Sequence, residues 1–259
     1  MFAPWTRDGH IRADVIQIAP DVSGLIQKVE VHDNQVVKRG DVLFTIDQDR
    51  FKLALRHAQA SLAERKETLA QASRETRRNR GLGNLVAQEQ LEESQSREAR
   101  AQSALAEAQV AVDAAQLNLD RSVVRSPVDG YLNDRAPRPH EFVSAGKPVL
   151  SVVDSNSYHV DGYFEETKLS GIHIGQAVDI RVMGDNARLR GHVQSFAAGI
   201  EDRDRSSGAN LLPNVNPAFS WVRLAQRIPV RIAFDEVPAD FRMIAGRTAT
   251  VSIIDGKYQ

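Results

Sequence analysis

The chain contains two copies of one short β-type pattern, separated by a long helical stretch. Glycines mark both copies, Gly24 and Gly40 in the first and Gly130 and Gly146 in the second, and 40 − 24 and 146 − 130 both give 16. An apolar pair stands at the same offset in each copy, at 36–37 and 142–143. Two matching halves around an insertion predict one β domain that is split in the sequence and closed in space.

Between the halves, apolar residues recur at alternating steps of four and three, as on two packed helices. The outgoing arm carries Phe51, Leu55, Ala58, Leu62, Arg65, Leu69, Ala72 and Thr76. The return arm carries Ala101, Leu105, Ala108, Val112, Ala115 and Leu119. Apart from Arg65 and Thr76, this is a narrow Ala/Leu stripe, typical of a coiled coil. The breakers Gly81, Gly83 and Asn84 predict the turn of a hairpin about 45–50 Å long.

After Asp154 the pattern returns to strands, in which apolar and polar residues alternate. Three such runs are centred on Ile180, Ile232 and Val251 and indicate a small antiparallel barrel. Residues 165–169 predict a short helical turn, and the polar, glycine-containing stretch 201–217 predicts a long mobile loop between barrel strands.

The predicted fold is mainly β and elongated, with a long α-helical coiled-coil hairpin, a split lipoyl/biotinyl-like domain and an antiparallel β-barrel. The expected layout is an N-terminal segment entering the barrel or membrane-proximal region (1–14), the first lipoyl-like half (15–48), the hairpin (49–121), the second lipoyl-like half (122–155) and the barrel (156–259).

The composition and the motifs of the chain exclude several classes of function. Lys and Arg number 33 against 34 Asp and Glu, so the net charge of −1 argues against nucleic-acid binding. The chain has no cysteine, which excludes disulfides, thiolate metal sites and cysteine nucleophiles. No phosphate loop, nucleophile elbow or zinc-binding helix motif is present. We therefore expect a protein that is not an enzyme and needs no cofactor.

Several stretches resemble the membrane fusion proteins, the HlyD-type periplasmic adaptors of tripartite efflux pumps. These stretches are residues 5–8, 18–26, 31–35, 44–48, 165–169 and 221–227. Among these adaptors, the chain is most similar to the subunits that serve efflux of p-hydroxybenzoic and other aromatic carboxylic acids. The resemblance implies self-association into a ring, usually a hexamer. It also implies two partners, an inner-membrane aromatic acid exporter and an outer-membrane channel of the TolC type. The expected location is the periplasm, with attachment to the inner membrane by an N-terminal helix that is missing from this chain.

The resemblance also suggests contact residues at the turn of the hairpin. Related adaptors carry an Arg, a Leu and a Ser there for docking to the outer-membrane channel. Arg78 and Leu82 fit this set, whereas Ala87 stands at the Ser position. From the sequence alone, an ordinary hairpin loop is the simpler explanation, because breakers and charges are normal at a turn. The resemblance favours a docking surface at this turn instead, though not a role for each of the three residues.

Other functions stay open at this point. An adaptor for multidrug or peptide export would share the architecture. A biotin or lipoyl carrier would need a modified lysine at the tip of the lipoyl-like domain, but that tip is where the helices are inserted, and Lys52 lies on the helical flank. A pure coiled-coil scaffold would leave the barrel unexplained.

Three groups of charged residues have simple explanations as solvated surface. Arginines in the barrel segment could line a conduit for organic anions, but outward-facing strand positions explain them as well; they are Arg181, Arg188, Arg190, Arg223, Arg227 and Arg231. The pairs His32-Asp33 and His140-Glu141 offer too few ligands for a metal. Asp8 and His10 fall in a start that we predict to be irregular.

Overall fold

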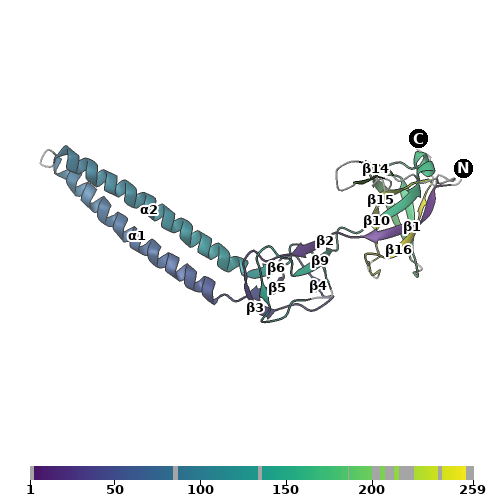
Figure 1. The fold of residues 1–259 in the computed structure, drawn as a ribbon, viewed down its shortest axis with the longest axis horizontal. Coiled ribbons are helices and arrows are strands. Elements are labelled where there is room, and N and C mark those ends of the chain that lie inside the picture. Colours follow the sequence, from purple (N-terminus) through teal and green to yellow (C-terminus); the bar gives the residue numbers. More distant parts are fainter. Residues whose placement is uncertain are drawn as a thin grey trace. The chain divides into compact units, whose positions relative to one another are not determined.

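The structure is a computed structural model that describes residues 3–83, 87–133, 136–185, 187–199, 205–207, 213–215, 225–238 and 241–254. The chain divides into two compact units, residues 1–15 with 154–259, and residues 16–153 (Figure 1). Each unit has a hydrophobic core of its own.

The unit of residues 16–153 contains two four-stranded sheets, with strand orders β2-β9-β7-β4 and β6-β5-β3-β8. Both sheets mix strands from before and after the helices. The strands are β2 (Val15–Ile18), β3 (Gly24–Val29), β4 (Val36–Val37), β5 (Val42–Ile46), β6 (Val123–Arg125), β7 (Gly130–Leu132), β8 (Phe142–Val143) and β9 (Leu150–Asp154).

The two halves of the repeat share one core. Val37 on β4 lies opposite Gly130 on β7, and Gly24 on β3 lies opposite Val143 on β8. Buried side chains from both halves form a single cluster, among them Ile26, Leu43, Phe44, Leu132, Val143 and Val152. The predicted β domain closed from two distant stretches is therefore confirmed.

The repeat is also visible in the backbone. Asn34 and His140 adopt positive φ angles of 56° and 68°, and Gly40 and Gly146 adopt 91° and 75°. The members of each pair are 106 residues apart, because 140 − 34 and 146 − 40 both give 106. Left-handed conformations are costly for residues with a side chain, so their recurrence shows that the two halves build the same turns.

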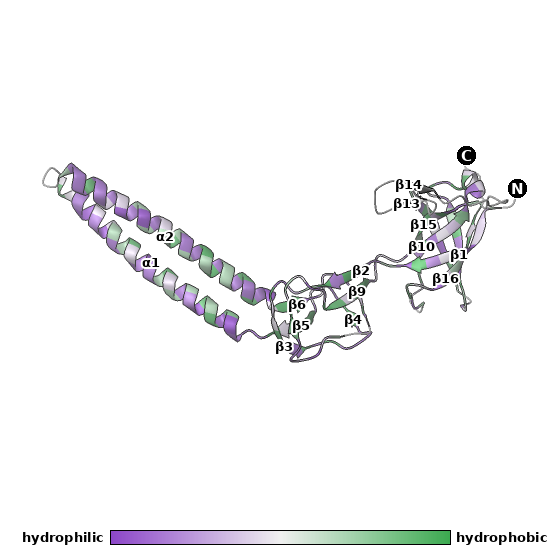
Figure 2. Cartoon of the chain, viewed as in Figure 1, coloured by the Kyte–Doolittle hydropathy of each residue, from purple (hydrophilic) through white to green (hydrophobic). Residues whose placement is uncertain are grey.

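Two helices join the halves, α1 (Asp49–Gly81) and α2 (Gln88–Arg121). Every position of the predicted stripe is buried or half-buried except Arg65, which is exposed. Figure 2 shows polar residues over much of the rest of both helices. At 1.5 Å per residue, each helix is about 50 Å long.

Polar contacts attach both helices to the sandwich. The backbone N–H of Asp49 donates to the carboxylate of Asp47 (3.1 Å), which fixes the start of α1. The Gln48 side-chain amide donates to the hydroxyl of Ser122, at the end of α2 (2.9 Å). Phe51 belongs to the sandwich core, and Leu119 packs against that core. The helices therefore leave the sandwich from one common base.

The other unit is a closed barrel with the strand order β1-β10-β15-β12-β11-β16, and all neighbouring strands are antiparallel. The strands are β1 (Trp5–Arg12), β10 (His159–Glu165), β11 (Ala177–Val182), β12 (Arg188–Phe196), β15 (Arg227–Glu236) and β16 (Thr248–Ile253). The predicted helical turn is a 3-10 helix, η2 (Glu166–Gly171). Fully buried side chains fill the interior, among them Val160, Phe164, Ile180, Val193, Ile232 and Val251.

Two details differ from the predictions. The start of the chain is not irregular, because residues 5–12 form β1, which pairs with β10 and β16. These partners are distant in the sequence, so no local pattern indicates them. Within the predicted loop 201–217, the short strands β13 (Arg205–Ser207) and β14 (Pro213–Val215) pair with each other. The remainder of that loop, like Asn84 in the helical turn, lies outside the described residues.

Candidate functional site

The structure places the three predicted contact residues at the same end of the two helices. Arg78 lies in the last turn of α1 and is exposed. Leu82 caps that helix, with its N–H donating to the Arg78 carbonyl (3.2 Å), and its side chain is 45% exposed. Ala87 is also exposed and precedes α2 with an extended backbone (φ −60°, ψ 140°). A cation, an apolar side chain and a small residue are therefore available to a partner at this turn.

Next to this turn, polar side chains replace the apolar ones between the helices. Thr76, Asn79 and Ser94 are almost fully buried. The Thr76 hydroxyl donates to the Ser94 carbonyl (3.0 Å), whereas the Asn79 side-chain nitrogen has no hydrogen-bond partner within the described part of the chain. Buried polar groups with incomplete hydrogen bonding stabilise packing less than apolar ones do. The turn end is therefore the less tightly stabilised end of the helical pair.

Charged side chains tie the helices together at the same end. Arg97 on α2 donates to both carboxylate oxygens of Glu75 on α1 (3.1 Å each) and to Glu93 one turn earlier (3.0 Å). The Ser73 hydroxyl donates to Glu98 (2.6 Å). This hydrogen bond is the main cause that holds the pKa of Glu98 below its ordinary value of 4.5.

Sequence reasoning missed Asn79 and Ser94, although a signal was present. Asn79 lies seven residues after Ala72, and Ser94 lies seven residues before Ala101, so both extend the apolar stripe by one heptad. The change from apolar to polar residues at these positions marks where the packing changes.

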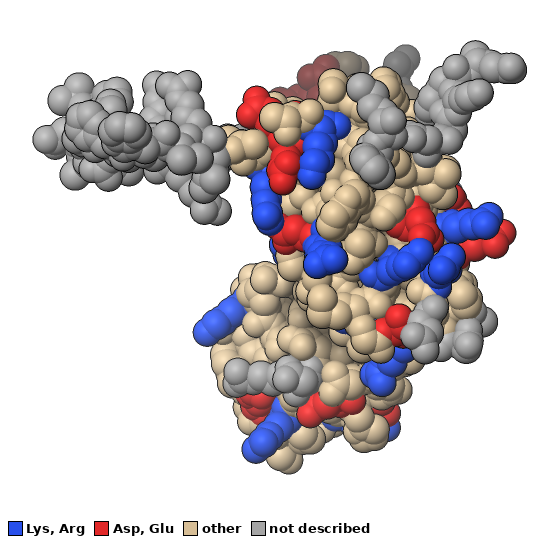
Figure 3. All heavy atoms as spheres, turned by 90° about the vertical axis from the view of Figure 1, so that its right-hand side faces the viewer, with Lys and Arg blue, Asp and Glu red and all other residues tan. Residues whose placement is uncertain are grey.

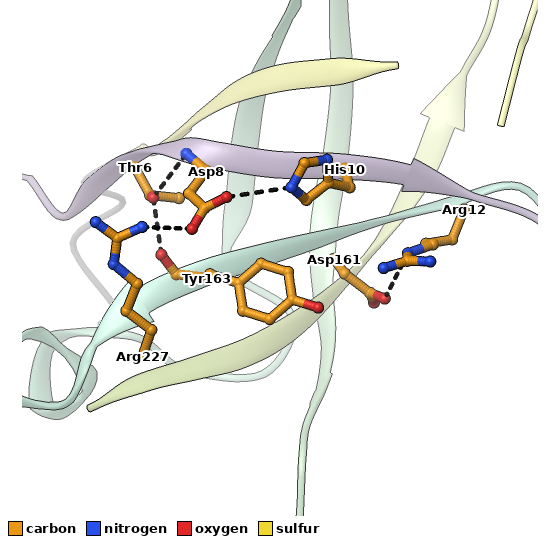
Figure 4. Close-up of polar contacts among 7 residues, drawn as sticks. All are labelled: Thr6, Asp8, His10, Arg12, Asp161, Tyr163 and Arg227. Carbon is orange, nitrogen blue, oxygen red and sulfur yellow. Dashed lines mark hydrogen bonds and ion pairs between the residues drawn. The ribbon is translucent and has the colours of Figure 1, made fainter. Parts of the chain in front are cut away.

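A second group of polar residues lies on the barrel and holds β1 in place (Figure 4). Asp8 forms an ion pair with Arg227 on β15, and its other carboxylate oxygen is 3.2 Å from His10 Nε2. The Thr6 hydroxyl donates to the carbonyl of Tyr163 on β10 (2.8 Å). These contacts connect the start of the chain to strands more than half the chain away, which closes the barrel.

An open hollow of about 430 Å³ lies beside this group. Trp5, Asp8, Glu165, Lys168 and Arg227 line it together with three neighbours. These five come from three stretches that carry the resemblance to the adaptors, residues 5–8, 165–169 and 221–227. The fold therefore brings described residues from three distant, distinctive stretches to one surface.

Two comparisons decide the family. Residues 14–155 match the family model described as the barrel-sandwich hybrid domain of the RND membrane fusion proteins, and residues 157–254 match the AAEA-like β-barrel domain. The uncharacterized protein YdhJ of Escherichia coli strain K12 is 41% identical over 254 residues, which cover 98% of this chain and 89% of YdhJ. The chain belongs to the membrane fusion proteins. This family provides the periplasmic adaptors of efflux pumps, as the sequence resemblance predicts.

Solved structures of other membrane fusion proteins share the fold. The membrane fusion protein Spr0693 from Streptococcus pneumoniae R6 is 15% identical, with a TM-score of 0.71 over 96% of this chain and 98% of that one. The periplasmic adaptor protein EmrA is 16% identical, with a TM-score of 0.52 over 96% of this chain and 97% of that one.

The barrel arginines of this membrane fusion protein lie outside its core. Arg181, Arg188, Arg190, Arg227 and Arg231 are exposed, whereas their neighbours in the strands are buried or, beside Arg227, half-buried; Arg223 lies outside the described residues. Figure 3 shows Lys and Arg interspersed with Asp and Glu on the face viewed. Because apolar side chains fill the barrel, these arginines do not line a conduit through it.

The histidine pairs also lie in exposed turns. His32, Asp33, His140 and Glu141 are exposed, and the Asp33 carboxylate accepts a hydrogen bond from the N–H of Ala136 (2.7 Å). The described residues include no group of three or more potential metal ligands. None of the helices that the structure describes is both long and apolar enough to span a bilayer.

Proposed function

We propose that this membrane fusion protein links an inner-membrane aromatic acid exporter to an outer-membrane channel of the TolC type and that the pump exports hydroxylated aromatic carboxylic acids. The observation that carries the proposal is that strands before α1 and strands after α2 close a single sandwich. One base holds both helices, so that their far end is carried about 50 Å from the sandwich.

In this proposal α1 and α2 act as a coiled-coil hairpin that reaches the channel. Arg78, Leu82 and Ala87 form the contact surface at its end. An exposed Arg offers several hydrogen-bond donors and is enriched in protein interfaces, and an exposed Leu offers apolar surface. The small Ala87 allows close approach of the partner but offers no hydroxyl to it.

The remaining parts have structural roles in the assembled pump. The proposed layout is a barrel domain with the N-terminal segment (1–14 and 156–259), a lipoyl-like sandwich (15–48 and 122–155) and the hairpin (49–121). The protein works in the periplasm, attached to the inner membrane, with its barrel toward the transporter. Copies associate into a ring, a hexamer, and the solute crosses the space that the ring encloses, because the interior of each barrel is filled by side chains.

The narrower assignment of cargo rests on two supports. The sequence stretches named above resemble adaptors for aromatic carboxylic acids, and residues 157–254 match the AAEA-like barrel family model. Adaptors for drugs or peptides share the same architecture, so the cargo has to be measured directly.

An export assay tests this function. Cells that lack the gene are loaded with a hydroxylated aromatic carboxylate, a cationic dye or a labelled peptide, and efflux is followed with and without the restored gene. We expect restoration to increase export of the carboxylate severalfold and to leave the other two unchanged. Restored export of the dye or the peptide alone would assign the adaptor to a different pump.

A further inference from the structure

The two helices carry opposite net charges. Between Asp49 and Gly81, α1 has nine Lys or Arg and four Asp or Glu, so 9 − 4 gives +5. Helix α2 has three Lys or Arg and seven Asp or Glu, so 3 − 7 gives −4. The chain as a whole is nearly neutral, so this separation lies within the helical pair.

Contacts within one chain use little of this difference, since Arg77 and Arg80 of α1 act on Glu98 of α2 only near the turn. Among the described residues, the ion pair that joins the two helices runs the opposite way, from Arg97 on the acidic helix to Glu75 on the basic helix. Away from the turn, the excess positive charge of α1 and the excess negative charge of α2 therefore stay available to another molecule.

On α1, the available charge surrounds an exposed apolar residue near the sandwich. Leu53 is 60% exposed and follows the stripe residue Phe51 by two positions, which places it about 200° round the helix from the stripe. Lys52 and Arg56 beside it are exposed and make no ion pair within the described chain. These residues, with Asp49, Arg50 and Leu55, line an open hollow of about 730 Å³.

On α2, the matching surface is acidic and apolar. Val110 and Leu117 are 66% and 48% exposed, and each follows a stripe residue by two positions. Asp113 and Asp120 stand three residues after them, one turn along the helix. Both carboxylates accept hydrogen bonds from neutral glutamine amides (2.9 and 2.8 Å) and make no ion pair in the part of the chain that the structure describes.

The two surfaces stand at the same height above the sandwich. Leu53 is four residues after the start of α1 at Asp49, and Leu117 is four residues before the end of α2 at Arg121. Both therefore lie about 6 Å along their helices from the base. Each surface faces away from the other helix of its own chain, so the two can meet only between copies.

We propose that the Lys52–Leu53–Arg56 face of α1 in one copy docks on the Val110–Asp113–Leu117–Asp120 face of α2 in the next copy. The contact is head-to-tail: each copy uses its α1 face on one side and its α2 face on the other, which allows a ring to close. Leu53 packs against Leu117, which lies at the same height, while opposite charges set the register. This interface deepens the proposed self-association and rests on it.

Cross-linking tests the contact directly, because the natural chain has no cysteine. The full chain with Leu53→Cys and Leu117→Cys together is treated with a short bis-maleimide at high concentration. We expect a ladder of covalent multimers from the double variant and only monomers from either single variant. Dimers from a single variant would show a symmetric contact and overturn the proposal.

A charge exchange provides the matched second test. One variant carries Lys52→Glu and Arg56→Glu, so that both of its faces are acidic. The other carries Asp113→Lys and Asp120→Lys, so that both faces are basic. We expect each variant alone to associate at least about tenfold more weakly than the natural chain in sedimentation experiments, and an equal mixture to recover association. Circular dichroism of each variant checks that its helices are intact.

The outcomes separate this interface from the proposed function. If the double cysteine variant still associates but gives no cross-linked multimers, or if the mixture does not recover association, the interface is overturned and self-association stands. A chain that stays monomeric at every concentration overturns both the interface and the ring. The export assay decides the adaptor role independently of either result.

Discussion

At the scale of single residues, the repeat depends on glycines that allow close backbone approach. A side chain at Gly130 would place its Cβ 2.0 Å from the carbonyl oxygen of Val153, and one at Gly24 would lie 2.6 Å from Ile46. Strands of the sandwich approach each other too closely at these points for any larger residue. The matching glycines of the two halves are therefore a packing requirement as well as a sequence signature.

The Gly130→Ala substitution should destabilise the sandwich. The neighbouring group is backbone and cannot rotate away, so the strands must separate, at a cost of about 2–3 kcal/mol. Gly81→Ala is the control, because nothing lies within 4 Å of its added Cβ at the end of α1. Calorimetry should show a lower unfolding temperature for the first variant only. Equal stability of the two variants would contradict the close packing of β7 against β9.

Ala87 offers a substitution that should stabilise the protein. It is the N-cap of α2 and has no side-chain acceptor for the free N–H groups of the first turn. Ala87→Ser supplies one, so we expect a gain of roughly 1 kcal/mol in the stability of the helical pair. Ala87→Val adds bulk without an acceptor and serves as the control. Hydrogen exchange of the first amides of α2 measures both variants, and unchanged protection in the Ser variant would argue against the cap.

Glu98 should make stability depend on pH. Its pKa is lowered mainly by the Ser73 hydrogen bond, with smaller lowering by Thr76, Arg80 and Arg77 and an opposing effect of burial. A lowered pKa in the folded state stabilises the protein above the ordinary value of 4.5, and this contribution is lost as pH falls through the folded pKa. The melting temperature of Glu98→Gln should therefore fall below that of the natural chain near pH 7 and approach it near pH 3. If the difference in melting temperature between the two proteins persists at pH 3, the substitution acts through packing and not through the charge of Glu98.

At the scale of elements, the helical stripe decides how α1 and α2 pair. Its residues are small or apolar near the sandwich and polar near the turn, where Thr76, Asn79 and Ser94 are buried. The base of the pair is thus held by apolar packing and by contacts to the sandwich core. The turn end depends on hydrogen bonds and ion pairs.

Leu105→Pro should disrupt α2 in its middle. Proline removes a backbone hydrogen bond and clashes with the preceding turn, at a cost of about 3 kcal/mol or more. Leu105→Ala shortens the same half-buried side chain but keeps the helix, and it separates the backbone effect from the packing effect. Far-UV circular dichroism should show less helix for the proline variant alone. Undiminished helix in that variant would contradict the assignment of the stripe.

Much of this organisation could be predicted from the sequence, because it repeats locally. The glycine spacing predicts the sandwich, the four-and-three spacing predicts both helices, and alternation predicts β11, β15 and β16. β1 could not be predicted, since its polar residues Thr6 and Asp8 find their partners, Tyr163 and Arg227, on distant strands. Asn79 and Ser94 were missed because the helical spacing continues through them while the chemistry of the residues changes.

At the scale of the whole molecule, the chain consists of two units, and the proposed function assigns a different partner to each. The sandwich and its helices offer a surface at the turn, and the barrel offers a surface where three distinctive stretches meet. A substitution at one of these surfaces should therefore affect one partner and spare the other.

The most direct test of the adaptor role is capture of both partners from membranes. The tagged full chain is expressed in cells that contain the pump, and bound proteins are identified by mass spectrometry. We expect the natural chain to retain an inner-membrane transporter and an outer-membrane channel, and Arg78→Glu to lose about tenfold or more of the channel while keeping the transporter. Arg65→Glu, an exposed site within α1, is the control and should retain both. Capture of neither partner by the natural chain would contradict the account.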